Sequence, residues 1–422
     1  MPRWQKSPRK KPSRLNGNFW RLWWADTVNS VGNGAFVAAM PLLALTVTTD
    51  PVQISAVPAA EYLPWLLVSL PAGVLVDRYD RTRLMWLCQA FQVAIVLWIA
   101  IAIATGTVDL YALVVASFLL GCAQVVISNA AQAVLPQLVP SDLLPRANSN
   151  LYVVQTIGET SLGPPLGSLL FAAAATLPFG LDAGSFAFSA ILLATLPRRQ
   201  AARAKPDSMR KQVSEGLQWL WSQRLLRTLA LALGMNTFCN QMGFATLVLL
   251  ATQTLHLTEG GYGLLLLGIG AGSVLGGLIN PTLIRHLGTV PAFTAALAVN
   301  AVLYVAMSVA PNVAVLAVLL GLCGLAMTVS TVATVSLRQQ MVPDRLLGRV
   351  NSVYRMLGWG LMPLGALAGG FVADRFGLRA PFMVAGALRI GLLVALMPVL
   401  ITEARIVRAL SSPPPSELPG IR

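Results

Sequence analysis

The chain has 422 residues, of which 56% are hydrophobic and only 11% are charged, whereas soluble domains carry about 25% charged residues. A soluble fold could not bury that much apolar surface, so the composition excludes a soluble enzyme or signalling domain and predicts an all-α membrane protein. The net charge of +14 could indicate nucleic-acid binding. The positions of the basic residues along the chain decide between that function and membrane topology.

Twelve apolar stretches of about 20 residues follow one another along the chain, with charged residues gathered between them. That length crosses a ~30 Å hydrocarbon core as a helix. Gly and Pro are tolerated inside membrane helices and do not mark where a helix stops. The sequence therefore indicates the number of helices more clearly than the residues at which they end. We predict twelve transmembrane helices, at about 19–47, 53–76, 84–104, 110–134, 147–172, 175–196, 225–252, 261–283, 290–309, 312–337, 349–372 and 380–402.

A basic segment, 1–18, precedes the first predicted helix. When the connections between helices are assigned alternately to the two sides of the membrane, 26 of the 30 Lys and Arg residues fall on one side, and only Arg375 and Arg379 fall on the other. The side rich in basic residues is cytoplasmic by the positive-inside rule. We therefore expect a multi-pass protein of the cell (cytoplasmic) membrane with both termini in the cytoplasm, and no nucleic-acid partner.

The turn between the second and third predicted helices reads Gly-Val-Leu-Val-Asp-Arg-Tyr-Asp-Arg-Thr-Arg from residue 73. Gly73 permits close helix packing, and Asp77 can meet the N-terminal dipole of a neighbouring helix. Arg78 and Arg81 can add ionic contacts that break when parts of the protein move. Anchoring at the membrane surface explains the basic residues but not the Gly and Asp at this spacing, so we interpret these four residues as a gating motif.

The fifth predicted helix contains Glu159, followed by Gly163, Pro164 and Gly167. Small residues let helices approach closely, and a proline removes a backbone donor and kinks the helix. Kinking alone accounts for this pattern, and any further role depends on the resemblance described below.

The connection 197–224 begins with the basic, helix-breaking run Pro-Arg-Arg. Apolar residues recur at roughly helical spacing in its second part, with Gln and Arg between them, at Leu217, Leu220, Trp221 and Leu225. This pattern favours an amphipathic helix on the cytoplasmic membrane surface. A plain solvated linker is the alternative.

An internal repeat relates the two sides of this linker. Residues 139–149 and 342–352 are identical at seven of eleven positions, with an offset of 203. The chain is therefore a duplicated six-helix unit, with halves at 19–196 and 225–402 and a disordered, proline-rich tail at 403–422. An even number of helices gives both copies the same orientation, and substrate should then bind between them.

These motifs together resemble the major facilitator superfamily. The turn at 73–83 resembles its signature loop, G-x-x-x-D-R-x-x-R-R, and Gly163, Pro164 and Gly167 match its exporter-associated motif, G-x-x-x-G-P-x-x-G-G. Stretches at 63–67, 135–140, 146–149 and 362–366 look like the branch of macrolide-efflux and enterobactin-export proteins.

The resemblance implies the major facilitator fold, with twelve transmembrane helices in two six-helix halves. It also implies a secondary active transporter that exports a small amphipathic molecule, such as a drug or a macrolide-like or siderophore-like compound, by proton-coupled alternating access. Import of a small solute on the same fold is the alternative.

Ionisable residues inside the predicted helices are the main site candidates, because a charge at mid-membrane costs at least ~2.5–3.5 kcal/mol. Glu159 lies near the midplane and is the first candidate for carrying the coupling proton, with Asp26 the second. Glu61 and Asp182 lie in the outer third, and a structural hydrogen bond or ion pair explains Asp182 better than a functional role.

Four further polar residues are expected to complete this interior. We expect Arg355 and Arg389 to pair with the acids, and Asn33 and Asn236, which are equivalent at the repeat offset, to line the cavity. By contrast, we interpret Trp23, Trp24 and Trp65 as interfacial belt residues.

Other functional classes have little support in the sequence. The four cysteines lie in predicted helices without metal-ligand spacing, and the two histidines lie near helix ends; no P-loop or nucleophile elbow is present. We therefore expect no enzyme activity, metal or cofactor, and a monomer whose partners are a small-molecule substrate, protons and the lipid bilayer. A membrane enzyme, or a receptor that retains a transporter fold, is a remote alternative.

Overall fold

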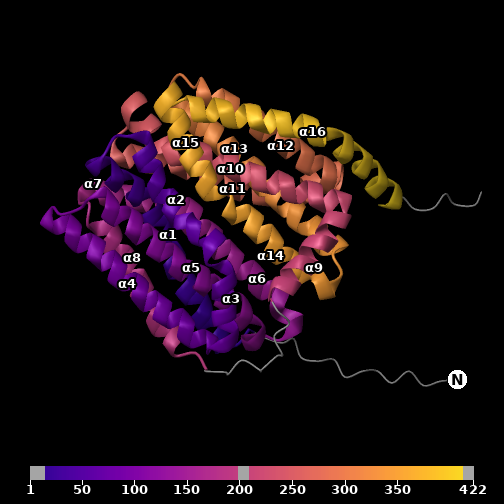
Figure 1. Ribbon diagram of the computed structural model, residues 1–422, viewed down its shortest axis with the longest axis horizontal. Helices are drawn as coiled ribbons and strands as arrows, with labels where there is room; N and C mark the ends of the chain where they lie inside the picture. Colours follow the sequence, from indigo (N-terminus) through magenta and orange to yellow (C-terminus); the bar gives the residue numbers. More distant parts are fainter. Residues whose placement is uncertain (1–14, 198–208, 412–422) are drawn as a thin grey trace, which may run out of the picture.

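The computed structural model describes residues 15–197 and 209–411, and their regular secondary structure is entirely helical (Figure 1). Most of the predicted basic segment and part of the tail lie outside these residues. The elements are α1 Gly17–Val47, α2 Pro51–Leu67, α3 Ser69–Arg78, α4 Arg81–Thr105, α5 Leu110–Leu138, η1 Ser141–Leu143, α6 Leu144–Gln155, η2 Thr156–Leu162, α7 Gly163–Ala173, α8 Leu177–Ala194, α9 Met209–Ser222, α10 Arg224–Leu249, η3 Leu250–Thr254, α11 Glu259–Leu287, α12 Thr289–Ser308, α13 Val313–Met341, α14 Asp344–Gly360, α15 Met362–Phe376 and α16 Ala380–Ser411.

Short polar side chains mark where several helices begin. Asp50, Asp80 and Asp109 precede α2, α4 and α5, and each carboxyl accepts hydrogen bonds from backbone N–H groups of the first turn at 2.7–3.1 Å. Such a cap satisfies donors that have no partner within the helix. Asn312 caps α13 in the same way, and it is the repeat partner of Asp109.

Helix boundaries recur at the offset of the sequence repeat. α5 and α13 coincide at both ends when 203 is added to the first, α4 and α12 coincide at their last residues, and α8 and α16 coincide at their first. The repeated sequence therefore directs the same local structure twice.

Several of the helices are broken, and proline accounts for part of this. The fifth predicted helix passes from α6 through the π-helical segment η2 into α7, whose second and third residues are Pro164 and Pro165. Neither proline can donate to the preceding turn, which favours such an irregularity. The second predicted helix bends by 61° between α2 and α3.

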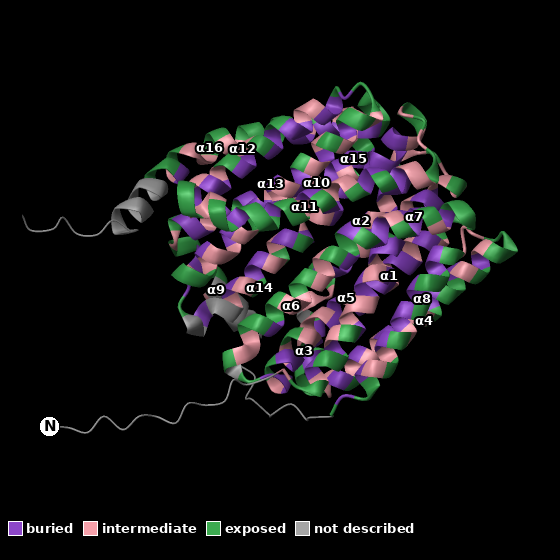
Figure 2. Ribbon diagram, turned by 180° about the vertical axis from the view of Figure 1, so that it is seen from behind, coloured by how far each residue is buried: buried purple, intermediate pink, exposed green. Residues whose placement is uncertain are grey.

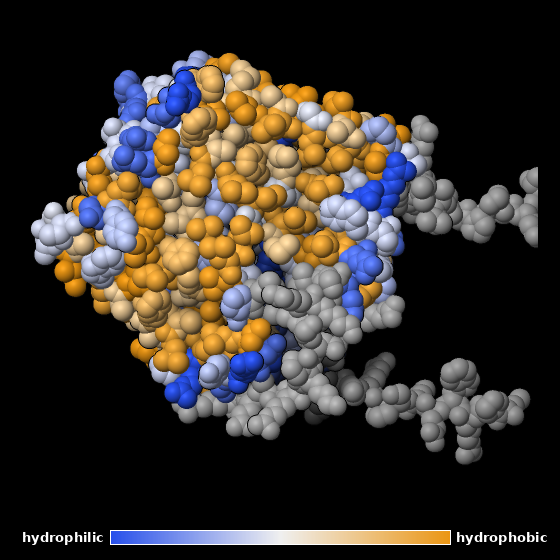
Figure 3. Space-filling view, viewed as in Figure 1, coloured by the Kyte–Doolittle hydropathy of each residue, from blue (hydrophilic) through white to orange (hydrophobic). Residues whose placement is uncertain are grey.

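The outer surface of the bundle is apolar. Side chains in the middle of the outward-facing helices are exposed, including Ile101 of α4, Ile191 of α8, Val302 of α12 and Val394 of α16, each with 61–66% of its surface exposed. Figure 3 shows hydrophobic side chains over most of one face, with hydrophilic ones near its margins. A soluble protein does not expose apolar surface on this scale.

Within the described residues, nine helices are long and apolar enough to span a membrane, and the bent pair of α2 and α3 makes a possible tenth. All twelve predicted spans are occupied by helix. The two that are not counted by length and apolarity, 147–172 and 225–252, contain Glu159 and Asn236, so their polar interiors lower their hydropathy.

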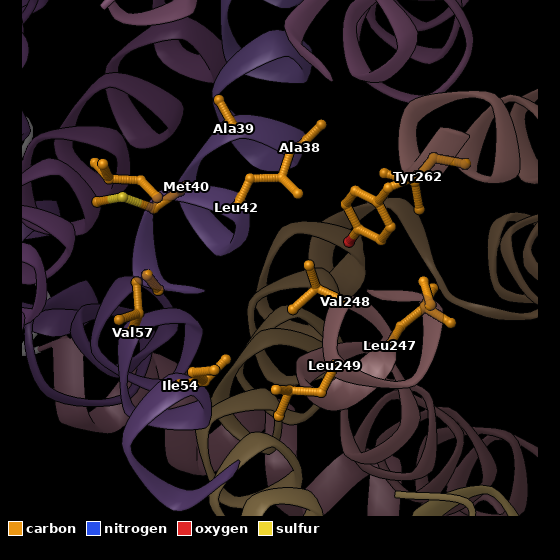
Figure 4. Packing of buried hydrophobic residues seen from close by; sticks show 14 of the residues in the cluster. Ala38, Ala39, Met40, Leu42, Ile54, Val57, Leu247, Val248, Leu249 and Tyr262 are labelled. Atoms are coloured by element: carbon orange, nitrogen blue, oxygen red, sulfur yellow. The ribbon is translucent and has the colours of Figure 1, made fainter. Parts of the chain in front are cut away.

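The N-terminal helices α1–α8 and the C-terminal helices α10–α16 lie side by side (Figure 1), and they contact each other mainly through α2 with α15 and through α7 with α11. One hydrophobic cluster draws on both groups: Leu42 of α1 and Ile54 of α2 belong to it, together with Leu247, Val248 and Leu249 of α10 (Figure 4).

Two other clusters each belong to one group. Phe19, Met85 and Leu138 pack within the N-terminal group, and Leu226 and Leu400 within the C-terminal group. The two groups are thus sealed together near the end of α1 and packed separately near its beginning. Figure 2 shows buried residues along the helices of both groups.

The structure bears on the predicted linker and changes one predicted boundary, the end of the last helix. Helix α9 occupies most of the described part of the linker, in agreement with the helical spacing of its apolar residues, and Leu220 is fully buried. The last helix was predicted to end at 402 but continues to Ser411. The sequence contains no Gly or Pro between Pro398 and Pro413, so nothing stops the helix earlier.

Candidate functional site

Two adjoining cavities lie mainly within the N-terminal group and share part of their lining. Their volumes are about 270 and 460 Å³. We call the smaller one the acidic chamber; it is lined by residues including Asn33, Glu61, Tyr62, Gln92 and Asp182. We call the larger one the Arg355 chamber; it is lined by residues including Asp26, Asn29, Met85, Gln89 and Arg355. Both are bordered by Trp65, Gln124, Ser128, Gln155, Glu159 and Trp359.

Glu159 lies where the two chambers meet. It belongs to the π-helical segment η2, and its side chain is open to the cavity. Asn33 and Glu61 line the acidic chamber together with Glu159, and Asp26 lines the Arg355 chamber together with it. The structure therefore brings together both predicted proton-coupling residues and Asn33.

Asp26 is held by the same helix pair. Gln155, one turn before Glu159, donates its side-chain amide to both carboxyl oxygens of Asp26 at 3.0 and 3.2 Å. This contact links α1 to α6 at the wall of the Arg355 chamber. Asp26 and Glu159 thus lie on adjacent elements but in different hydrogen-bonding environments.

Two more acids line the acidic chamber, and sequence reasoning gave them too little weight. Only 1% of the Asp182 side chain is exposed; one carboxyl oxygen accepts from Ser185 at 3.4 Å, and the other has no partner. Glu61 lines the same chamber. Counting residues from a helix end placed both in the outer third, and it could not show that α2 and α8 face one cavity.

An aromatic pair joins the two helix groups across the cavities. The rings of Trp65 in α2 and Trp359 in α14 are stacked, with centroids 4.9 Å apart and an interplanar angle of 21°, and Tyr62 lies 6.0 Å from Trp359. Trp65 is buried, so its interpretation as an interfacial belt residue was wrong. Trp24, with 52% of its surface exposed, remains compatible with a belt position.

Arg355 reaches across from the C-terminal group but does not pair with an acid. Its guanidinium donates to the side chains of Gln132 and, at 3.4 Å, Asn129 of α5. Ion pairs of the described residues include Arg349 with Glu215 and Arg375 with Asp374, neither of which involves Arg355. The predicted pairing of Arg355 with an intramembrane acid was wrong because those acids lie on the far walls, in α1, α2, η2 and α8.

Arg389 is also separate from the acids, in the interior of the C-terminal group. Its guanidinium lies 3.8 Å from the Tyr304 ring centroid and donates to the Asn236 carbonyl oxygen at 3.1 Å. Only 3% of the residue is exposed, and its Nε and Nη1 atoms have no partner. Arg389 and Asn236 therefore lie together, outside both chambers, which corrects the expectation that they join the acids.

The glycines of the fifth helix let it contact two other helices. A Cβ atom added to Gly163 would lie 2.5 Å from the Cα of Gly34, and one added to Gly167 would lie 2.2 Å from the Ala35 carbonyl oxygen. On the other side, Gly270 of α11 packs against Thr160. Gly163, Pro164 and Gly167 are all buried.

The four residues of the predicted gating motif lie at the turn between α3 and α4. Asp77 and Arg78 are exposed, Gly73 is half-buried, and Arg81 donates to the Ala133 carbonyl oxygen at 3.2 Å. The acid that meets a helix N-terminus is Asp80, the cap of α4, rather than Asp77. Their proposed role in gating stays a prediction.

The sequence matches a family model described as transmembrane secretion effector over residues 12–418. The multidrug efflux pump Tap of Mycolicibacterium fortuitum is 27% identical over 367 residues, which cover 83% of this chain and 88% of that protein. An MFS-type transporter of Bacillus subtilis, YfiS, is 25% identical over 233 residues, 54% of either chain.

Two solved structures share the fold at low sequence identity. The nucleoside transporter NupG aligns with a TM-score of 0.72 at 12% identity, covering 91% of this chain and 99% of that chain. A bacterial homologue of the iron transporter ferroportin, in an inward-facing state, aligns with a TM-score of 0.68 at 17% identity, covering 90% of this chain and all of the other.

Proposed function

Because the chain belongs to the transmembrane secretion effector family of the major facilitator superfamily, we propose that it is a proton-coupled exporter of small amphipathic molecules. It is a membrane-spanning transporter of the efflux type and not an enzyme. The observation that carries the finer proposal is the cavity system, in which two candidate proton carriers, Asp26 and Glu159, border a space that lies mainly within the N-terminal group and is also lined by Arg355 and Trp359 of the C-terminal group.

We propose twelve transmembrane helices in two six-helix halves, 19–196 and 225–402, joined by the linker 197–224. The repeated helix boundaries and the repeated sequence at the offset of 203 support this arrangement. Duplicated units with the same orientation place the substrate site between them. We further propose that the transporter acts as a monomer.

The proposed orientation has both termini in the cytoplasm, as the distribution of basic residues favours. The beginning of α1 is then at the cytoplasmic side. The hydrophobic cluster shared by the two halves would close the outer side, and the separately packed halves would leave the chambers on the inner side. An exporter loads its substrate from that side.

Export is favoured over import by the relative that is named a multidrug efflux pump. Gly163 and Gly167 of the exporter-type motif pack α7 against α1, and Gly263 and Gly270 of α11 pack against α7 and η2 from the other side. A small movement of α11 would therefore act directly on the segment that carries Glu159. This position suits a residue whose access changes as the halves rock.

We propose that Glu159 carries the coupling proton, with Asp26 as the second candidate. Glu159→Gln retains the shape and hydrogen-bonding capacity of the side chain but removes its titration. In reconstituted vesicles, downhill exchange of a substrate should persist, whereas accumulation driven by a pH gradient should be lost. Glu259→Gln, at an exposed position in the first turn of α11, is the matched control and should behave like the parent protein.

Two results would contradict these proposals. If the Glu159→Gln variant still concentrates substrate by using a proton gradient, Asp26 or another acid is the carrier. If the parent protein moves none of a panel of amphipathic compounds in either direction, the proposal of efflux itself fails.

A further inference from the structure

The acidic chamber contains acids but no base. Glu61, Glu159 and Asp182 line it from α2, η2 and α8, and no Lys, Arg or His is among the described residues of its lining. Opposite charge in a low-dielectric site stabilises a carboxylate far more than the same charge does in water. An ionised chamber of this composition therefore favours a positively charged occupant.

Three residues of the chamber lining carry buried hydrogen-bond acceptors without a partner. One oxygen of Asp182 has no partner, and neither has the amide oxygen of Gln92, although only 1% and 2% of these residues are exposed. The amide oxygen of Gln124 is also without a partner. Buried acceptors are rarely left unsatisfied in proteins, so these atoms favour an occupant that brings positive charge or N–H donors.

Aromatic side chains form the remaining walls. Trp65, stacked on Trp359, and Tyr62 border the chamber on the side of the C-terminal group, and Phe36 and Phe186 lie in its lining. The face of an aromatic ring attracts a cation within about 6 Å of its centroid. The same rings offer apolar contact area to the body of an amphipathic molecule.

A metal ion does not fit these residues as well as an organic cation. Within the part of the chain that the structure describes, no three His, Cys, Asp or Glu side chains are grouped so that they could hold a metal. The two chambers together have the size of a site for a drug-like molecule, which is typically ~300–1,000 Å³. Both the spacing of the acids and the volume favour a larger occupant with a dispersed charge.

We propose that the acidic chamber binds an amphipathic organic cation, whose charge lies among Glu61, Glu159 and Asp182 and whose apolar body contacts Trp65 and Trp359. This proposal rests on the proposed efflux function and names its substrate class. The single base of the cavity system, Arg355, borders only the other chamber. The charge of a bound cation would thus lie in the chamber that is farther from Arg355.

Direct binding to the purified full-length protein tests the charge preference. Tetraphenylphosphonium and tetraphenylborate have nearly the same size and shape but opposite charge, and each is titrated separately by calorimetry. We expect the cation to bind at least tenfold more tightly than the anion. Glu61→Gln and Asp182→Asn should each weaken binding of the cation about tenfold. Glu259→Gln is the control and should leave binding unchanged. Partition of the cation into the detergent should be the same for all variants.

Trp359→Leu should weaken binding of the cation more than Trp359→Phe, because only the latter keeps a ring at this wall. If Asp182→Asn does not yield folded protein, Glu61→Gln decides the matter. Equal binding of both ions, or binding of the cation that neither acid variant weakens, would overturn the proposal. If proton-driven uptake of neutral compounds persisted in that case, the proposal of a cation site would fail and the efflux function would stand. If the cation bound as expected but no compound were transported, the efflux function would fail and the cation site would stand.

Discussion

The N-terminal and C-terminal groups of helices, proposed above as two halves, share several helix boundaries but carry opposite charges in their interiors. The N-terminal half contains Asp26, Glu61, Glu159 and Asp182, and the C-terminal half contains Arg355 and Arg389. At the repeat offset the four acids correspond to Leu229, Leu264, Met362 and Ala385, and the two arginines to Tyr152 and Phe186. Equivalent positions therefore carry helix ends in both groups of helices, whereas the four intramembrane acids lie in the N-terminal group.

This difference suggests that the two halves have different roles in transport. The N-terminal half contributes most of the walls of both chambers, and the C-terminal half contributes chiefly Trp359 and Arg355. The interior of the C-terminal half is instead occupied by Arg389 stacked on Tyr304. We infer that the N-terminal half binds protons and substrate, and that the C-terminal half moves against it.

The largest effect is expected at Gly167, where α7 packs closely against the backbone of α1. A Cβ atom added there would lie 2.2 Å from the Ala35 carbonyl oxygen and 2.5 Å from its Cα. Backbone atoms cannot turn aside as a side chain can, so Gly167→Ala should destabilise the protein by about 3 kcal/mol, near the upper end of ordinary overpacking. The midpoint of thermal unfolding in detergent measures it.

Gly184 of α8 is the matched control, because a Cβ atom added there meets nothing within 4 Å. Gly184→Ala should be neutral or should stabilise the helix by up to about 1 kcal/mol. If Gly167→Ala were as stable as Gly184→Ala, the close contact of α7 with α1 would not be a constraint on the fold.

A smaller effect is expected at Arg389, whose charge is buried in the C-terminal half. Arg389→Lys should destabilise the protein by about 2 kcal/mol, because lysine retains the buried charge but loses the planar contact with Tyr304. Arg389→Met should be closer to neutral, since removal of a buried charge offsets the lost contacts. Thermal unfolding of both variants gives the order of stability.

The opposite order, with Met less stable than Lys, would show that positive charge at this position is required. The comparison of the halves would then change, because Arg389 would have a functional partner in another state of the transporter. Proton-driven transport by the Arg389→Met variant would identify that role.

The sequence predicted the fold far better than it predicted the site. The twelve apolar stretches coincide with helices because a ~30 Å hydrocarbon core requires about 20 apolar residues, whatever their neighbours. The choice of Glu159 and Asp26 as candidates followed from the rarity of intramembrane acids, whereas their position at one cavity was not predicted. Which helix faces which could not be predicted, because a single sequence contains no information on the rotation of one helix about its axis relative to the next.

Three residues illustrate that limit. Trp65 has the composition of a belt residue but stacks on Trp359 across the chambers. Asp182 was interpreted as structural, yet one of its oxygens is unpartnered at the wall of a cavity. Arg389 was assigned to the acids by its depth alone, although it lies in the other half. For Trp65 and Arg389 the predicted surroundings were wrong, whereas Asp182 has a structural hydrogen bond, from Ser185, as well as a place in the cavity wall.

The smallest effect is expected at Asp77, which lies outside the chambers on the exposed end of α3. Its repeat partner is Asn280, so Asp77→Asn gives the N-terminal turn the residue that the C-terminal half already has. We expect the transport rate to fall about fivefold, the lower end of typical coupling between sites, because the charge stabilises one access state. The dissociation constant of the substrate should change less than twofold.

Asp80→Asn is the matched control for this variant. Asp80 caps α4 through a hydrogen bond of 2.7 Å to the Arg83 backbone N–H, and Asn caps helices about as well as Asp. This variant removes the same charge three residues away while retaining the fold of the turn, so transport should be preserved. If Asp80→Asn slowed transport as much as Asp77→Asn, the net charge of the turn would matter rather than the position of Asp77. If Asp77→Asn instead weakened binding and transport equally, Asp77 would support the shape of the site. The N-terminal turn would then have no gating role that its C-terminal counterpart lacks.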